Sequence, residues 1–286
     1  MKNANIAILI DMSEMDNIIL NYAKRLDESH HFNSIHLVHF VEVTEFPKEI
    51  LEMYPDLDQP IENMIAEEIE EYKNDCLPHC QEKIKIHVHG GGEMESFLEW
   101  MDEQSFDLVI IGKKSGSHGS GIFSGKMVRL LSNNTLFVTE MARGDIHKIM
   151  VPIDFSNYTQ KVLKLAKTSA NLINAELVPV HALKMSLQYY PFVKNKEELE
   201  KMLEKEVEKK FEKLKQKTGI SESCLIVNAG DQHISKAIYD QAIFQSIDLI
   251  ILGNKGKADD SDLLIGSVAE RMIAHDRNIP VLIVNK

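Results

Sequence analysis

An internal repeat constrains this chain of 286 residues more than any other feature. The sequence ILIDMS at residues 8–13 is answered 143 positions later by VPIDFS at residues 151–156. The sequence DLVIIGKK at 107–114 returns 141 positions later as DLIILGNK at 248–255. Because the elements recur in the same order, we expect two copies of one domain, 1–143 and 144–286. The boundary near Gly144 is short and polar, which favours domains that pack together.

Strand-like and helix-like segments alternate within each copy. In the second copy, apolar segments typical of strands lie at 149–153, 177–182, 225–227, 248–252 and Val281–Val284. Helical spacing predicts helices at Thr159–Ile173, 197–217, 234–245 and 268–275, the first with Val162, Leu165, Ala166, Ser169 and Ile173 inward. The first copy repeats the scheme, with a charged helix at about 61–72. The pattern predicts an α/β fold with a parallel sheet and helices on both faces.

Composition narrows the classes of binding partner that this chain could have. The net charge of −12 argues against nucleic acid and against an anionic membrane surface, because both attract basic proteins. No apolar run approaches the ~20 residues that span a bilayer, and we find no signal peptide. The three cysteines are an odd number without framework spacing, as in a reducing compartment. We therefore expect a cytoplasmic protein.

Glycines and one aspartate mark a candidate ligand site in the second copy. Gly253 and Gly256 follow a buried strand, and Gly266-Ser267 precedes an apolar helix. Glycine lets a backbone approach a ligand closely, and a helix start offers free N–H groups to an anion. Asp154, at the end of the first strand of this copy, would share the same crevice and accept bonds from ribose hydroxyls. Turn formation by the glycines and capping by Asp154 are the structural alternatives.

These residues resemble the universal stress protein family. The spacing Gly253-x-x-Gly256-(nine residues)-Gly266-Ser267 matches the pattern of its ATP-binding members, and VPIDFS at 151–156 matches its first strand. The resemblance covers the chain as a tandem pair of domains. It implies Rossmann-like domains of the adenine nucleotide alpha hydrolase-like type, each with a five-stranded parallel sheet of order 3-2-1-4-5. It also implies a stress-response module that binds ATP, or a related adenine nucleotide, without rapid turnover.

The resemblance also assigns roles. Pro152 and Asp154 would line the adenosine pocket, with Asp154 on the ribose, and the backbone of Ala182 would meet the adenine. The remaining residues would lie along the nucleoside or hold the phosphates: Leu252, Gly253, Gly256, Gly266, Ser267 and Val268.

The first copy departs from the pattern. Ser115 stands at the second glycine position, Lys126 replaces the serine, Leu9 replaces Pro152, and bulky Phe40 stands at the place of Ala182. Asp11 is retained. Because Phe40 would fill the adenine pocket, we expect that the first domain does not bind ATP in the family's manner.

Other readings of the same chain stay open. Asp259, Asp260 and Asp262 would repel a triphosphate unless Mg²⁺ bridges them, and such a site would allow slow ATP hydrolysis. A nucleotide-free interaction scaffold is a third reading. We expect an unidentified protein partner, an intramolecular pseudo-dimer of the two domains and, as a further option, a homodimer.

Histidines and cysteines outside the glycine pattern have structural explanations. Cys76, His79 and Cys80 do not match a standard zinc spacing, and strand alternation places His87 and His89 on one face. The histidines that end equivalent strands, His39 and His181, favour structural hydrogen bonding over catalysis.

Overall fold

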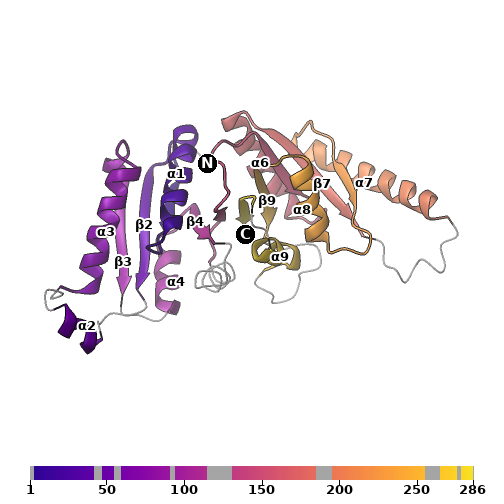
Figure 1. Ribbon diagram of the computed structural model, residues 1–286. Helices are drawn as coiled ribbons and strands as arrows, with labels where there is room; N and C mark the ends of the chain where they lie inside the picture. Colours follow the sequence, from indigo (N-terminus) through magenta and orange to yellow (C-terminus); the bar gives the residue numbers. More distant parts are fainter. Residues whose placement is uncertain are drawn as a thin grey trace. The chain divides into compact units, whose positions relative to one another are not determined.

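The computed structural model divides into two compact units, Met1–Glu140 and Met141–Lys286. It describes residues 3–41, 47–54, 59–90, 94–114, 131–184, 195–254, 265–275 and 278–285 (Figure 1). Strands in the first unit follow the order β3-β2-β1-β4-β5, and those in the second follow β8-β7-β6-β9-β10. Within each unit the neighbouring strands pair in parallel. The predicted α/β fold, with the order 3-2-1-4-5 in each half, is confirmed.

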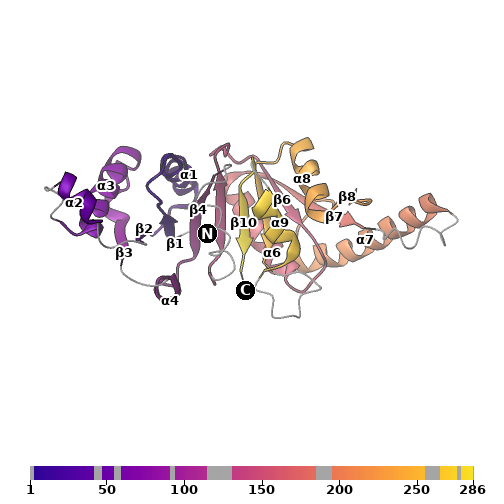
Figure 2. The same ribbon diagram turned by 60° about the horizontal axis from the view of Figure 1, so that its bottom comes forward.

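The first unit alternates strands with helices after a short polar start. Its elements are β1 (Asn5–Leu9), α1 (Glu14–His30), β2 (Ser34–Val41), α2 (Lys48–Met53), α3 (Ile61–Cys76), a 3₁₀ turn (Gln81–Lys83), β3 (Ile84–Gly90), α4 (Met94–Glu103), β4 (Leu108–Lys113) and β5 (Thr135–Thr139). Helices α1 and α3 lie on one side of the strands and α4 on the other (Figure 2).

The second unit repeats this arrangement. Its elements are β6 (Lys148–Pro152), α6 (Thr159–Ile173), β7 (Glu176–Leu183), α7 (Lys196–Thr218), β8 (Leu225–Asn228), α8 (Ile234–Phe244), β9 (Leu249–Gly253), α9 (Ser267–His275) and β10 (Val281–Val284). Helix α6 packs with α7 and α8 packs with α9, and Figure 2 shows α7 and α8 on opposite sides of β7. Both faces of the central strands are therefore covered, which explains their continuous apolar sequence.

A repeated aspartate ties the central strands together at their amino ends. Asp107 accepts a hydrogen bond from the Asn5 N–H at 2.8 Å. Asp248 accepts bonds from the His147 and Lys148 N–H groups at 2.8 and 3.0 Å. The backbone N–H groups of Asp107 and Asp248 donate in return to the carbonyls of Asn5 and Lys148. The aspartate before each apolar strand thus sets the register between the first and fourth strands of its unit.

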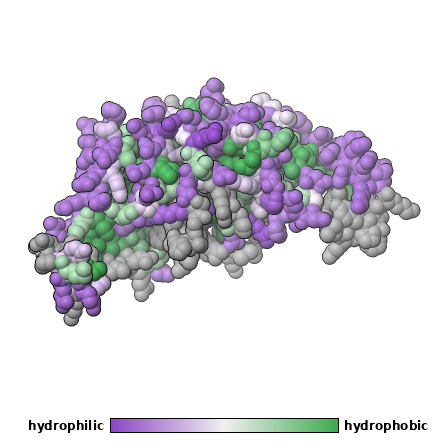
Figure 3. Space-filling view, viewed as in Figure 1, coloured by the Kyte–Doolittle hydropathy of each residue, from purple (hydrophilic) through white to green (hydrophobic). Residues whose placement is uncertain are grey.

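Helix α7 shows how local sequence sets an element's length. It begins at Asn195, whose side chain accepts a bond from the Glu198 N–H, and ends at Gly219, which has φ +68°. Only glycine adopts that backbone readily. The surface over α7 is largely hydrophilic (Figure 3), in keeping with its charged outer face. None of the helices in the described ranges is both long and apolar enough to cross a membrane.

Helix α6 has the predicted bounds, but its buried face differs from the predicted one. Val162 and Ala166 are buried as expected, whereas Leu165, Ser169 and Ile173 are only partly buried. The helix instead buries Leu163 and Ala170. Because α6 packs against α7 as well as against the sheet, its inward face is wider than one stripe and turned from the predicted centre.

Glycines at the ends of β4 and β9 make room for the first helix of each unit. A Cβ atom on Gly253 would lie 2.6 Å from the Tyr158 ring, and one on Gly112 would lie 2.5 Å from Cγ of Met15. The space that the missing Gly253 side chain leaves is therefore taken by the Tyr158 ring. The glycine is needed for helix–sheet packing.

We expect replacement of the two glycines by alanine to lower the stability of the protein by different amounts. Gly253→Ala should destabilise the protein by about 1–3 kcal/mol, because the Tyr158 ring is rigid and overpacking strains a core. Gly112→Ala should cost less, because the unbranched Met15 side chain can change rotamer. Urea unfolding followed by circular dichroism measures both. An equal loss in the two variants would contradict this account.

A cluster of histidines and aromatic residues lies between β2, β3 and α4. His36 Nδ1 lies 2.9 Å from His87 Nε2, and the two rings stack at 5.1 Å. His87 and His89 both pack against Trp100, which confirms that they share one face of the sheet. Burial, then the charges of His87 and Lys85, lower the pKa of His36 from 6.5 to about 4. Burial and Lys85 lower the pKa of His87 as well.

This cluster predicts acid sensitivity of the first unit. The unfolded chain protonates His36 near pH 6.5, whereas the folded unit does so only near pH 4. Stability should therefore be full above pH 6.5 and fall towards pH 4, by at most about 1.4 kcal/mol per pH unit for one proton. Fluorescence of Trp100, the single tryptophan, reports unfolding of this unit in urea.

His36→Gln should flatten this pH dependence, because the amide keeps hydrogen-bonding atoms but does not titrate in the window. The matched control is His79→Gln, since His79 is exposed. A pH dependence as steep in His36→Gln as in the unmodified chain would rule out the histidine pair as its source.

Candidate functional site

A cavity of about 340 Å³ opens at the carboxyl ends of β6, β7 and β9. Strand β6 pairs with β7 on one side and β9 on the other, so the strand order reverses here, where ligands of α/β sheets bind. Helices α6, α8 and α9 complete the wall. The lining residues are Pro152, Ile153, Asp154, Ser156, Tyr158, Thr159, Val162, His181, Ala182, Ile234, Ile238, Leu252, Gly253, Asn254, Gly266, Ser267, Val268 and Ala269.

Most of the residues predicted for the site come together in this cavity. The eight that line it are Pro152, Asp154, Ala182, Leu252, Gly253, Gly266, Ser267 and Val268. The ninth, Gly256, lies outside the described residues. Sequence reasoning missed Tyr158, at the N-cap of α6, and the α8 residues Ile234 and Ile238. The last two are apolar and one helical turn apart, which is the signal that predicts their shared inward face.

Asp154 occupies a tight turn between β6 and α6. Its Oδ1 accepts a hydrogen bond from the Ser156 N–H at 3.0 Å and another from the Thr159 hydroxyl at 2.7 Å. Thr159 is itself buried. These bonds hold the carboxylate in one orientation at the edge of the cavity. The N-cap position of α6 is Tyr158, so Asp154 stabilises the turn rather than capping the helix.

The amino end of α9 borders the same cavity. The Gly266 N–H donates to the Asn254 carbonyl at 2.6 Å, and the Asn254 N–H donates to the Val284 carbonyl at 2.9 Å. These bonds attach the helix start to the ends of β9 and β10. The first N–H groups of a helix lack intrahelical acceptors and carry partial positive charge, so this end suits an anion. Ser267, the first residue of α9, is exposed there.

Tyr158 connects the cavity to the last strand. Its hydroxyl donates to the Val284 carbonyl at 3.1 Å, and burial raises its pKa to about 12. The hydroxyl therefore stays protonated at neutral pH. Lys161 donates to the Asn285 carbonyl at 2.7 Å, so the start of α6 is attached to the end of β10 at two points.

Among the described residues, the equivalent place in the first unit carries larger side chains. The Phe40 and Phe97 rings pack with their centroids 5.0 Å apart. Ala182 and Ile238 stand at the repeated positions in the second unit, and both line the cavity. Lys114 forms an ion pair at 2.9 Å with Asp11, the counterpart of Asp154. Two large aromatic side chains thus stand where the second unit has smaller ones, and a lysine engages the aspartate.

Two histidines make the same backbone contact in the two units. Nδ1 of His39 lies 2.7 Å from the Ile10 carbonyl, and Nδ1 of His181 lies 2.6 Å from the Ile153 carbonyl. The predicted structural hydrogen bonding is confirmed. Because a carbonyl only accepts, Nδ1 carries the proton in both rings.

No described part of the chain gathers three or more histidine, cysteine, aspartate or glutamate side chains into a metal-binding group. The acidic residues Asp259, Asp260 and Asp262 lie outside the described residues, as do Ser115 and Lys126. The three thiols are free. Cys76 contacts Asn17 and Cys80 contacts Asp27, so these cysteines have neighbours within the first unit.

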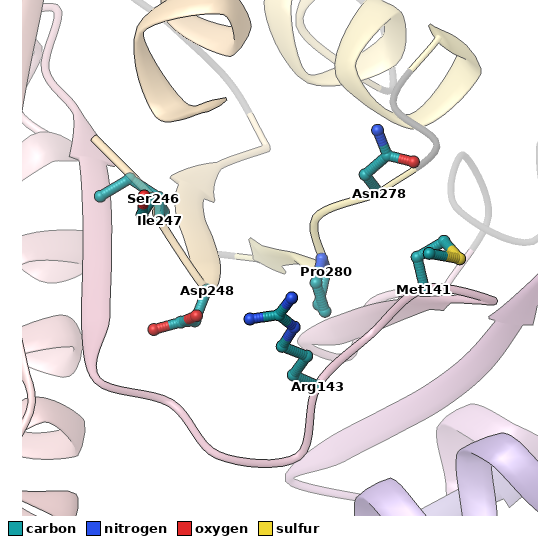
Figure 4. Close-up of a pocket in the computed structure, with 7 residues that line it drawn as sticks. All are labelled: Met141, Arg143, Ser246, Ile247, Asp248, Asn278 and Pro280. Carbon is teal, nitrogen blue, oxygen red and sulfur yellow. The ribbon is translucent and has the colours of Figure 1, made fainter. Parts of the chain in front are cut away.

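A second cavity, of about 220 Å³, lies at the amino end of β9 (Figure 4). Figure 4 shows Arg143 and Asp248 reaching towards it. Asp248 already accepts bonds from the His147 and Lys148 N–H groups. This second cavity lies at the amino ends of the strands, whereas ligands of such sheets bind at the carboxyl ends. The cavity beside Asp154 is therefore the stronger candidate for a ligand site.

Solved structures with this fold cover nearly the whole chain. A protein of unknown function from Pseudomonas aeruginosa PAO1 aligns with a TM-score of 0.65 and 14% identity, over 99% of this chain and 92% of that chain. A universal stress protein from Archaeoglobus fulgidus DSM 4304 aligns with a TM-score of 0.63 and 16% identity, over 100% and 97%. At these identities the likeness shows the fold alone.

The sequence comparisons address the family. No curated protein matches the chain. The model of the universal stress protein family matches twice, over residues 2–131 and 145–285, once in each half. These matches cover most of both repeats, and the chain therefore belongs to the universal stress protein family.

Proposed function

We propose that the second unit binds ATP or a related adenine nucleotide, and that the chain is a nucleotide-sensing module rather than a rapid enzyme. The observation that carries this proposal is the cavity beside Asp154, which gathers eight residues of the nucleotide pattern. Its volume of about 340 Å³ lies in the ~300–1,000 Å³ range of small-molecule sites.

The lining of the cavity suits the three parts of a nucleotide. Ala182, Ile234 and Ile238 offer an apolar wall to the flat adenine, and Pro152 and Leu252 extend it along the nucleoside. The Asp154 carboxylate accepts hydrogen bonds from ribose hydroxyls. Ser267 and Val268 offer backbone N–H groups and a hydroxyl to the phosphates, joined by Gly256. Gly266 lines the cavity beside them, and its own N–H is bonded to the Asn254 carbonyl.

We further propose that the first unit is structural and takes no nucleotide in this manner. Phe40 and Phe97 fill the place of the adenine wall, and the ion pair with Lys114 engages Asp11. One chain then holds one nucleotide. Binding in one unit of a tandem chain gives that nucleotide a means to alter the affinity for a protein partner.

Calorimetric titration with ATP and Mg²⁺ tests the function. We expect one site per chain. Ala182→Phe should lower the affinity at least about tenfold, because it copies the filled interior of the first unit. Ala274→Phe is the matched control: the same change at an exposed position of α9 outside the cavity should leave binding unchanged.

Each other result has a defined meaning. Two sites per chain would overturn the structural role of the first unit. No heat of binding at millimolar ATP would overturn the nucleotide proposal and leave an interaction scaffold. Release of phosphate that requires Mg²⁺ would identify a slow ATPase instead of a sensor.

A further inference from the structure

The turn that presents Asp154 contains a residue in an unfavourable conformation. Phe155, directly after Asp154, has φ +60°. A bulky side chain rarely adopts this left-handed backbone, and it persists only where surrounding contacts impose it. The contacts that impose it therefore control the direction of the neighbouring carboxylate.

His181 supplies two of these contacts. Its Nδ1–H donates to the Ile153 carbonyl at 2.6 Å, and its ring lies against the Phe155 ring with centroids 4.9 Å apart. The Ile153 N–H donates in turn to the Val180 carbonyl at 2.8 Å. The peptide groups on both sides of Ile153 are thus held by the end of β7, immediately before Asp154.

The same strand end borders the cavity. His181 and Ala182 both line it, as do Ile153 and Asp154 of the adjoining turn. Bonds from Ser156 and Thr159 orient the Asp154 carboxylate only while the turn keeps its shape. Without the histidine, the strained Phe155 backbone can relax and carry the carboxylate away from its place.

We propose that His181 is a positioning residue for the ligand. It holds the Ile153–Phe155 turn so that the Asp154 carboxylate meets the sugar hydroxyls of a bound nucleotide, and it thereby sets the preference for a ribose over a sugar without hydroxyls. This inference rests on the proposed nucleotide function and adds to it a residue that acts through Asp154 rather than on the ligand.

The first unit provides an internal control. His39 makes the same bond to Ile10 at 2.7 Å, and Met12 has φ +61° at the place of Phe155. There the aspartate pairs with Lys114 and aromatic rings fill the cavity. Removing His39 therefore loosens the same kind of turn without touching the proposed site.

The test compares two ligands by calorimetry, ATP and 2′,3′-dideoxy-ATP, which lacks both sugar hydroxyls. His181→Ala should lower the affinity for ATP about tenfold or more and leave that for dideoxy-ATP within about threefold. His181→Asn should keep the ATP affinity within about threefold, because its amide N–H can replace Nδ1–H. His39→Ala should leave both affinities unchanged.

Asp154→Ala completes the test. In a chain that already lacks this carboxylate, His181→Ala should cause no further loss of ATP affinity, because the two residues act in series. Circular dichroism verifies that each variant is folded. If His181→Ala does not fold, His181→Asn takes its place in the test.

The outcomes separate the two proposals. An unmodified chain that binds neither nucleotide overturns the proposed function and this inference with it. An unmodified chain that binds ATP, with equal losses for both ligands in His181→Ala, overturns only the inference. A His181→Ala variant that behaves like His39→Ala overturns it as well, because the histidine would then only support the fold.

Discussion

The reversal of strand order beside β6 determines where this molecule can hold a ligand. Strand β6 hydrogen-bonds to β7 on one side and to β9 on the other. The chain leaves β6 through α6, which packs with α7, and leaves β9 towards α9, which packs with α8. The connections diverge to opposite layers and leave a hollow between them. Asp154, Ala182, Gly253 and Gly266 meet there because each ends or begins an element at this edge.

The two units have the same topology but different side chains in their interiors. In the first, β1 makes the same reversal between β2 and β4, yet Phe40 and Phe97 pack into the hollow. Protein interiors favour such close packing, and an unfilled apolar space lowers stability. The second unit keeps small Ala182 where the first has Phe40. The second unit therefore keeps an open cavity although close packing would be more stable. A site that a ligand fills is expected to have this property.

The sequence predicted the framework well and the interior incompletely. Repeat spacing and apolar periodicity are local signals, so the strand order, the bounds of α6 and the shared edge of Asp154 and Gly266 could be anticipated. The ring that fills the space left by Gly253 could not, because Tyr158 is distant in sequence and its approach depends on how α6 lies on β9. The pair of Lys114 with Asp11 is equally a product of tertiary structure. Gly256, which the pattern predicted, lies outside the described residues.

The histidine contact shows which features belong to the fold and which to the site. Both units carry a left-handed residue after the aspartate, and both place a histidine on the preceding carbonyl. Since the first unit has this turn but a filled interior, the strained turn alone does not make a ligand site. What distinguishes the second unit is its cavity and a carboxylate held by Ser156 and Thr159 of its own turn, whereas Asp11 also pairs with Lys114. The turn supplies direction, the small side chains supply space, and a site needs both.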